Sequence, residues 1–170
     1  MSLVRQLRAI ALLPFLATVV VPGLLVYFTG AHAGWELPRA LWLVPFLVAA
    51  LLIALGLVLF VWTVMLFARA GRGTLAPWDP TERLVVLGPY RYVRNPMISG
   101  VLAVLLGEAV LLGSLPVLGW TIVFLLLNQL YIPQFEEPGM ERRFGDSYQR
   151  YRQHVPRWLP RLRPWHDDGV

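Results

Sequence analysis

Long runs of uncharged, apolar residues are the feature that most constrains how this chain can fold. Residues 9–28, 40–67 and 117–135 carry no charged side chain. A helix of about 20 residues spans the roughly 30 Å apolar layer of a bilayer. Hydrophobic residues make up 57% of the 170 positions and charged residues only 15%, which is too apolar for a soluble domain of this size. The sequence therefore predicts an all-α, polytopic integral membrane protein.

We expect about four transmembrane helices within a single membrane domain that covers residues 1–170. They are predicted over residues 9–28, 40–67, 96–112 and 117–135, with a loop over 68–95 and a tail over 136–170. The first run also has features of a signal peptide, because Arg5 and Arg8 precede it and Ala31-His32-Ala33 follows it. It is longer than a usual signal core, so we favour a retained helix.

The tail has the pattern of an amphipathic helix. Phe144, Tyr148, Tyr151 and Val155 follow one another in steps of four, three and four residues, which puts them on one helical face. We predict a C-terminal interfacial helix that lies on the membrane surface. Prolines from Pro156 onward end this pattern, and we expect the rest of the tail to be frayed.

The placement of arginines predicts the topology. All fifteen basic residues are arginines, and all but Arg39 fall in the N-terminal segment, the 68–95 loop or the tail. Arginine-rich segments near membrane helices stay on the cytoplasmic side. We therefore expect both termini and the long loop to face the cytoplasm, in a bacterial inner membrane.

Cysteine, histidine and net charge exclude several kinds of site. The chain has no cysteine, so disulfides, thiolate nucleophiles and Cys-based metal sites are excluded. His32, His154 and His166 are scattered along the sequence, and we predict no metal site. A pI near 10.2 is typical of nucleic-acid binding. Here the arginines flank apolar segments and form no separate basic domain, so we predict no nucleic-acid partner. The oligomeric state is left open.

A basic, proline-containing loop turns into an apolar helix within residues 88–100. Asn95 is a favourable N-cap and Pro96 a favourable first helical residue, and Arg91 and Arg94 precede them. The free N–H groups of a helix start suit an anionic ligand group. We interpret this stretch as one wall of a cofactor pocket at the membrane surface.

The opposite wall is predicted at Glu136-Glu137-Pro138. If the last two helices form a hairpin that turns near Ser114, equal rise per residue sets Glu136 level with Arg94. Two interpretations of the acids stay open. Either Glu137 opens the next helix while Arg94 pairs with Glu136, or one carboxylate binds a cationic ligand group. Adjacent helical residues point in different directions, so each glutamate can serve one of these roles.

Two features inside the hairpin have alternative explanations. Gly100 and Gly107 belong to a stripe of small residues, which indicates either close helix packing or room for a ligand. Gln129 is expected level with Gly100. Glu108 is an acid within an apolar helix, and it is either a functional group or a protonated acid bonded to Thr121 or to a backbone carbonyl.

Several of these residues form an ordered pattern. It consists of Arg94-Asn95-Pro96-Met97 through Gly100, Glu136-Glu137-Pro138, Phe144-Gly145, Tyr148, Tyr151 and Val155-Pro156. This pattern, over roughly residues 70–161, resembles the integral membrane methyltransferases, whose branches include isoprenylcysteine carboxyl methyltransferase and phosphatidylethanolamine N-methyltransferase. The isoprenylcysteine branch has His where Asn95 stands, so the phospholipid branch is the closer match. Both branches have Tyr where Ile98 stands.

The resemblance implies methyl transfer from S-adenosylmethionine to a lipophilic or membrane-embedded acceptor, either a carboxylate or an amine. It implies that the cofactor-binding residues are Arg94, Asn95, Pro96, Gly100, Glu136 and Glu137, and we add Tyr90 and Gln129 as predictions. We predict Glu137 and Arg94 as catalytic residues, because Glu137 is the nearest candidate to take a proton from an amine acceptor. We predict that Glu108, Tyr148 and Tyr151 bind substrate.

Two other functions stay open. Membrane sterol reductases resemble this chain in their C-terminal halves but bind NADPH. A non-enzymatic membrane scaffold or lipid binder would bind neither cofactor. Titration with S-adenosylmethionine and with NADPH separates the three.

Overall fold

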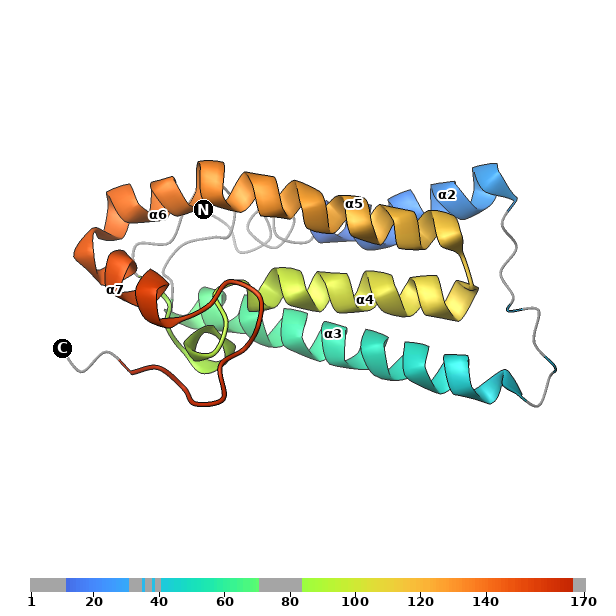
Figure 1. The fold of residues 1–170 in the computed structure, drawn as a ribbon, viewed down its shortest axis with the longest axis horizontal. Helices are drawn as coiled ribbons and strands as arrows, with labels where there is room; N and C mark the ends of the chain where they lie inside the picture. Colours follow the sequence, from blue (N-terminus) through green and yellow to red (C-terminus); the bar gives the residue numbers. More distant parts are fainter. Residues whose placement is uncertain (1–11, 31–34, 36–37, 39–40, 71–83, 167–170) are drawn as a thin grey trace.

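The computed structural model describes residues 12–30, 35, 38, 41–70 and 84–166, and its long helices lie side by side (Figure 1). The elements are η1 Leu16–Val20, α2 Val21–Thr29, α3 Leu43–Ala70, η3 Gly88–Arg91, α4 Pro96–Leu112, α5 Leu115–Tyr131, η4 Ile132–Glu136, α6 Glu137–Phe144 and α7 Asp146–His154. The cleavage-like motif at 31–33, the start of the first expected helix at 9–11, and residues 71–83 of the expected loop lie outside the described residues.

The all-helical membrane architecture predicted from the sequence is confirmed for the described residues. Three helical stretches are long and apolar enough to cross a membrane, namely Leu12–Thr29, Leu43–Leu66 and Leu115–Phe144. Helix α4 is a shorter apolar helix of 17 residues. It lies between α3 and α5 (Figure 1), which cover two of its sides, while Leu106 and Leu111 remain exposed.

Glycines bring α3 and α4 into backbone contact. A Cβ atom added at Gly100 would lie 2.8 Å from the carbonyl oxygen of Gly56, and one added at Gly107 would lie 3.0 Å from the carbonyl oxygen of Ala49. Such distances leave no space for a side chain. Close packing is therefore what Gly100 and Gly107 provide, as in other membrane helix pairs with small residues at the contact.

The N-terminal helix contacts α5 through a backbone carbonyl that has no partner in its own helix. In the π-helix η1 each N–H bonds the carbonyl five residues before it, as Val21 does with Leu16. The next position, Pro22, has no N–H, so the carbonyl of Ala17 lacks this partner. The indole Nε1 of Trp120 on α5 donates to that carbonyl at 2.9 Å. The contact supplies the partner that a backbone group at membrane depth requires.

The last membrane helix extends further than the sequence indicates. It was expected to end at residue 135, but the helical path continues through η4 and α6 to Phe144, a stretch of 30 residues from Leu115. The π-turn η4 contains Pro133, and Pro138 lies in the first turn of α6. The helix ends where Gly145 adopts φ of +52°, a value that favours glycine, and α7 then turns back (Figure 1).

The apolar face of the C-terminal segment packs on the protein itself. Tyr148, Tyr151 and Val155 share one face, as predicted, and form a buried cluster. The residues packed against it are Leu84, Val86, Met140, Phe144 and Trp165. The loop before α4 and the end of the tail thus cover this face within the chain. That the segment lies at the membrane surface stays a prediction.

The prediction of a frayed tail is wrong for residues 156–166. The N–H of Arg94 donates to the carbonyl of Pro156 at 2.9 Å, the N–H of Arg161 donates to Tyr92 at 3.0 Å, and the N–H of Trp165 donates to Arg91 at 3.0 Å. The tail therefore runs alongside the segment that leads into α4. Proline lacks a donor but keeps its carbonyl, which is why Pro156 can take part in this pairing.

Candidate functional site

The candidate site lies at one end of the helix bundle. The start of α4, the π-turn η4, helices α6 and α7 and the tail gather at this end, while the α4–α5 turn lies at the other (Figure 1). The arginines of the described chain belong to the segments at this end: Arg69, Arg91, Arg94, Arg142, Arg143, Arg150, Arg152, Arg157, Arg161 and Arg163. Which membrane face this end occupies stays a prediction from the arginine pattern.

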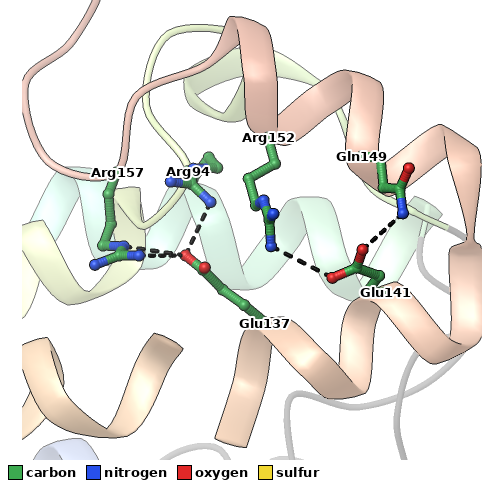
Figure 2. A network of polar contacts seen from close by, with 6 residues as sticks. All are labelled: Arg94, Glu137, Glu141, Gln149, Arg152 and Arg157. Carbon is green, nitrogen blue, oxygen red and sulfur yellow. Dashed lines mark hydrogen bonds and ion pairs between the residues drawn. The ribbon is translucent and has the colours of Figure 1, made fainter. Parts of the chain in front are cut away.

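A buried carboxylate joins the two predicted walls. Oε1 of Glu137 accepts a hydrogen bond from Nη1 of Arg94 at 2.8 Å, and it lies 3.0 Å from Nε and 2.8 Å from Nη2 of Arg157 (Figure 2). The Glu137 side chain is only 8% exposed and that of Arg94 12%. Charge-assisted pairs in such surroundings are strong but geometrically demanding. The three side chains, which we call the Glu137 triad, carry one net positive charge.

The partner of Arg94 is Glu137, which corrects the expected pairing with Glu136. The expectation assumed a regular α-helix, but η4 bonds each N–H to the fifth carbonyl before it, as Glu137 does with Ile132. A π-turn holds one more residue than an α-turn. The face that a regular helix would give to Glu136 therefore belongs to Glu137, and the Glu136 side chain is exposed.

Two buried tyrosines, Tyr148 and Tyr151, lie near the Glu137 triad, and Tyr151 is hydrogen-bonded to a third, Tyr90. Tyr90, Tyr148 and Tyr151 are buried, and the hydroxyl of Tyr151 donates to the carbonyl of Tyr90 at 2.8 Å. Burial, followed by the charge of Glu137, raises the pKa of Tyr148 to about 12. Burial also raises the pKa of Tyr90 well above its usual value, with the charges of Tyr151 and Glu136 adding to the effect. These phenols stay protonated at neutral pH.

Asn95 starts α4 without capping it. Helix α4 begins at Pro96, as the sequence indicates, but the Asn95 side chain makes no capping hydrogen bond, which corrects the expected N-cap role of that side chain. Its carbonyl instead accepts from the backbone N–H and the hydroxyl of Ser99, both at 3.0 Å. The Asn95 amide nitrogen is buried and has no partner among the described residues.

Three buried N–H donors at this end have no hydrogen-bond partner within the described part of the chain. They are Nε of Arg94, Nδ2 of Asn95 and Nε1 of Trp158. A buried donor without an acceptor costs free energy, about 1–3 kcal/mol for each group. The donor set suits the oxygen atoms of a carboxylate or phosphate group, and the exposed carboxylate of Glu136 suits a cationic group.

Other predicted site residues lie apart from the Glu137 triad. Gly100 faces the backbone of α3, and Gln129 is exposed on α5. Glu108 lies fourteen positions after Arg94, roughly 20 Å further along the helix axis. Thr121 donates to the carbonyl of Val117, and Oε2 of Glu108 is buried without a partner among the described residues, so the alternative of a bond between Glu108 and Thr121 is not observed. Their roles in binding cofactor or substrate stay predictions.

Arg157 and Trp158 are site residues that sequence reasoning missed. The prolines nearby favoured a frayed tail, so no ligand-binding side chain was predicted in residues 157–165. One feature could have pointed to Arg157, because two adjacent acids, Glu136 and Glu137, faced a single expected arginine partner. Among the described residues, no group of three His, Asp or Glu side chains could hold a metal ion.

Comparison with known proteins identifies a family to which most of these site residues belong by position. A family model described as phospholipid methyltransferase matches residues 44–147, which include α4, α5, η4 and most of the site. An uncharacterized protein of Haemophilus influenzae is 45% identical over 64 residues, which are 37% of this chain and 100% of that relative. Trp158 and Arg157 lie beyond the residues that the family model matches.

Proposed function

We propose, on the premise that this chain belongs to the phospholipid methyltransferase family, that it transfers a methyl group from S-adenosylmethionine to a lipid or lipophilic acceptor in the membrane. Membership of the family, together with the meeting of Arg94, Glu137 and the start of α4 at one end of the bundle, is the main support. The chemistry of the site adds further support, because its N–H donors suit the anionic end of this cofactor and its acids suit the cationic end.

The donor set fits the anionic end of the cofactor. Its carboxylate has two acceptor oxygens, and the site offers Nε of Arg94 and Nδ2 of Asn95, both buried and without a partner in the described residues. The positive end of the α4 helix dipole adds to the attraction. Glu136, exposed beside the triad, would hold the cationic amino or sulfonium group through charge-assisted contact.

Bound S-adenosylmethionine would supply an electrophilic methyl group, which the acceptor's lone pair attacks as the neutral thioether leaves. The protein's own part in such a reaction is to position and desolvate the reactants, which is enough to supply much of the acceleration. A carboxylate acceptor requires no base. An amine acceptor must first lose a proton, and the base we propose for this is now Glu136. Glu137 is less suited, because its Oε1 already accepts from two guanidinium groups.

We further propose that the acceptor reaches the site sideways from the bilayer, and that the site faces the cytoplasm of a bacterial inner membrane. The helices present large apolar side chains on their outer surfaces, among them Leu126, Leu130 and Phe135 on the helical path leading to Glu136. A lipid tail is well solvated along such a surface.

Cofactor titration tests the proposal. We expect purified wild-type protein in lipid nanodiscs to bind S-adenosylmethionine with a dissociation constant within the usual enzyme range, about 1 μM to 1 mM, and to bind NADPH at least tenfold more weakly, measured by isothermal titration calorimetry. Preferential binding of NADPH would instead support the sterol-reductase alternative. Binding of neither molecule would support the scaffold alternative.

A further inference from the structure

One tryptophan, Trp158, lies in the stretch of the tail that is hydrogen-bonded to the segment before α4. Two backbone hydrogen bonds, Arg94 N–H to Pro156 and Arg161 N–H to Tyr92, hold the tail against the segment before α4. Trp158 lies in the tail between these two points. Its neighbour Arg157 reaches Glu137 from the same segment (Figure 2). Trp158 therefore belongs to the part of the tail that is held against the segment leading into α4.

The indole nitrogen of Trp158 is buried and has no acceptor among the described residues. The same holds for Nδ2 of Asn95 and Nε of Arg94, which sit on the facing segment. Buried indole N–H groups usually find a partner. Three donors without acceptors, on two segments that are hydrogen-bonded to each other, indicate an acceptor that none of the described residues supplies.

The charge of the surroundings defines that acceptor. The Glu137 triad combines two guanidinium groups with one carboxylate, so a single negative charge beside it would be compensated. The three unsatisfied groups are all N–H donors, and none of them can accept. A carboxylate or a phosphate oxygen meets both requirements, because it brings negative charge and several acceptor lone pairs.

We propose that Trp158 is a ligand-binding residue, and that its indole N–H and the Asn95 amide form a subsite for an oxyanion, either a carboxylate or a phosphate. This deepens the proposed function and rests on it for one of the two sources, the cofactor carboxylate. The other source is the phosphate of a phospholipid headgroup. The tail is then part of the binding site, although it lies outside the residues that the family model matches.

A Trp158→Phe variant tests the proposal, because it removes the N–H and keeps an aromatic ring. Trp165→Phe is the matched control, since Trp165 lies in the same tail and packs its ring against Tyr151 and His154. If the oxyanion is the cofactor carboxylate, Trp158→Phe weakens S-adenosylmethionine binding about tenfold. Binding of decarboxylated S-adenosylmethionine, which lacks the acceptor, stays unchanged.

The second arm uses a short-chain lipid with the solubilised full-length protein. If the oxyanion is a phosphate, Trp158→Phe weakens binding of dihexanoylphosphatidylethanolamine about tenfold, and binding of dihexanoylglycerol, which lacks the phosphate, is unaffected. Absence of S-adenosylmethionine binding by the wild type would overturn the proposed function alone. In that case the lipid arm still tests whether Trp158 binds an oxyanion.

Two results would overturn the subsite. One is unchanged binding of both S-adenosylmethionine and the phosphate-containing lipid by Trp158→Phe. The other is an equal loss in Trp165→Phe, which would indicate a general effect on the tail. Thermal unfolding checks that each variant is folded. If Trp158→Phe does not fold, Asn95→Ala carries the same expectations, because it removes the second donor of the subsite.

Discussion

A Glu137→Gln variant is expected to have a free energy of unfolding about 3–5 kcal/mol lower than the wild type. The reason is that Oε1 of Glu137 is the shared acceptor of Arg94 and Arg157 in a site where the Glu137 side chain is 8% exposed. Gln keeps the shape but removes the charge, which leaves two guanidinium groups facing each other without compensation. Unfolding of the detergent-solubilised protein, followed by circular dichroism, measures the change.

Glu141→Gln is the matched control for this prediction. Glu141 lies one turn further along α6 and accepts hydrogen bonds from Arg152 and Gln149 (Figure 2). Its side chain is 35% exposed and that of Arg152 43%, so water replaces the lost contacts and the expected change is about 1 kcal/mol or less. Equal stability of Glu137→Gln and Glu141→Gln would contradict a supporting role for the Glu137 triad.

A Glu136→Gln variant is expected to keep its stability and to lose affinity for the cofactor. The side chain is exposed and belongs to no ion pair of the described residues, so the free energy of unfolding should change by no more than about 0.5 kcal/mol. Binding of S-adenosylmethionine should weaken roughly 10- to 100-fold, because a charge-assisted contact to a cationic group is lost. Calorimetric titration of the folded variant measures this change.

The Glu136→Gln and Glu137→Gln variants together distinguish the roles of the two glutamates. Glu137 holds the two walls of the site together, and Glu136 is proposed to contact the ligand. If Glu136→Gln leaves S-adenosylmethionine binding unchanged while a folded Glu137→Gln loses it, the assignment is reversed. The identical chemical change at adjacent positions excludes any explanation based on size or on helix propensity.

Local features of the sequence predict the helices well. Uncharged runs indicate the membrane segments, and Asn95-Pro96 marks the position where α4 begins. The small residues Gly100 and Gly107 indicate the close contact with α3. All these features act within one helix or between two neighbouring helices, and residue type and spacing therefore determine them directly.

The register at the site could not be predicted in the same way. The estimate that set Glu136 beside Arg94 used a regular rise per residue, and the π-turn η4 shifts the register by one position. Pro133 and Pro138 hint at irregularity, but proline also permits a kink or a helix end. The choice among these depends on packing against α4 and the tail, which no local pattern encodes.

The tail shows a second limit of sequence reasoning. Its prolines exclude a continuing helix, and fraying was the local expectation. The observed order comes from hydrogen bonds to Arg91, Tyr92 and Arg94, more than sixty residues earlier in the chain. Such non-local pairing has no sequence periodicity, and Arg157 and Trp158 were missed for this reason.

Labelled methyl transfer tests the central claim most directly. The wild-type protein in nanodiscs would be incubated with methyl-labelled S-adenosylmethionine and a total extract of lipids and small molecules, followed by mass spectrometry of the products. The proposed methyl transfer predicts label in a lipid-soluble product, attached to nitrogen or to a carboxylate oxygen. Absence of any labelled product, with S-adenosylmethionine recovered intact from protein that is folded and supplied with the full extract, would contradict it.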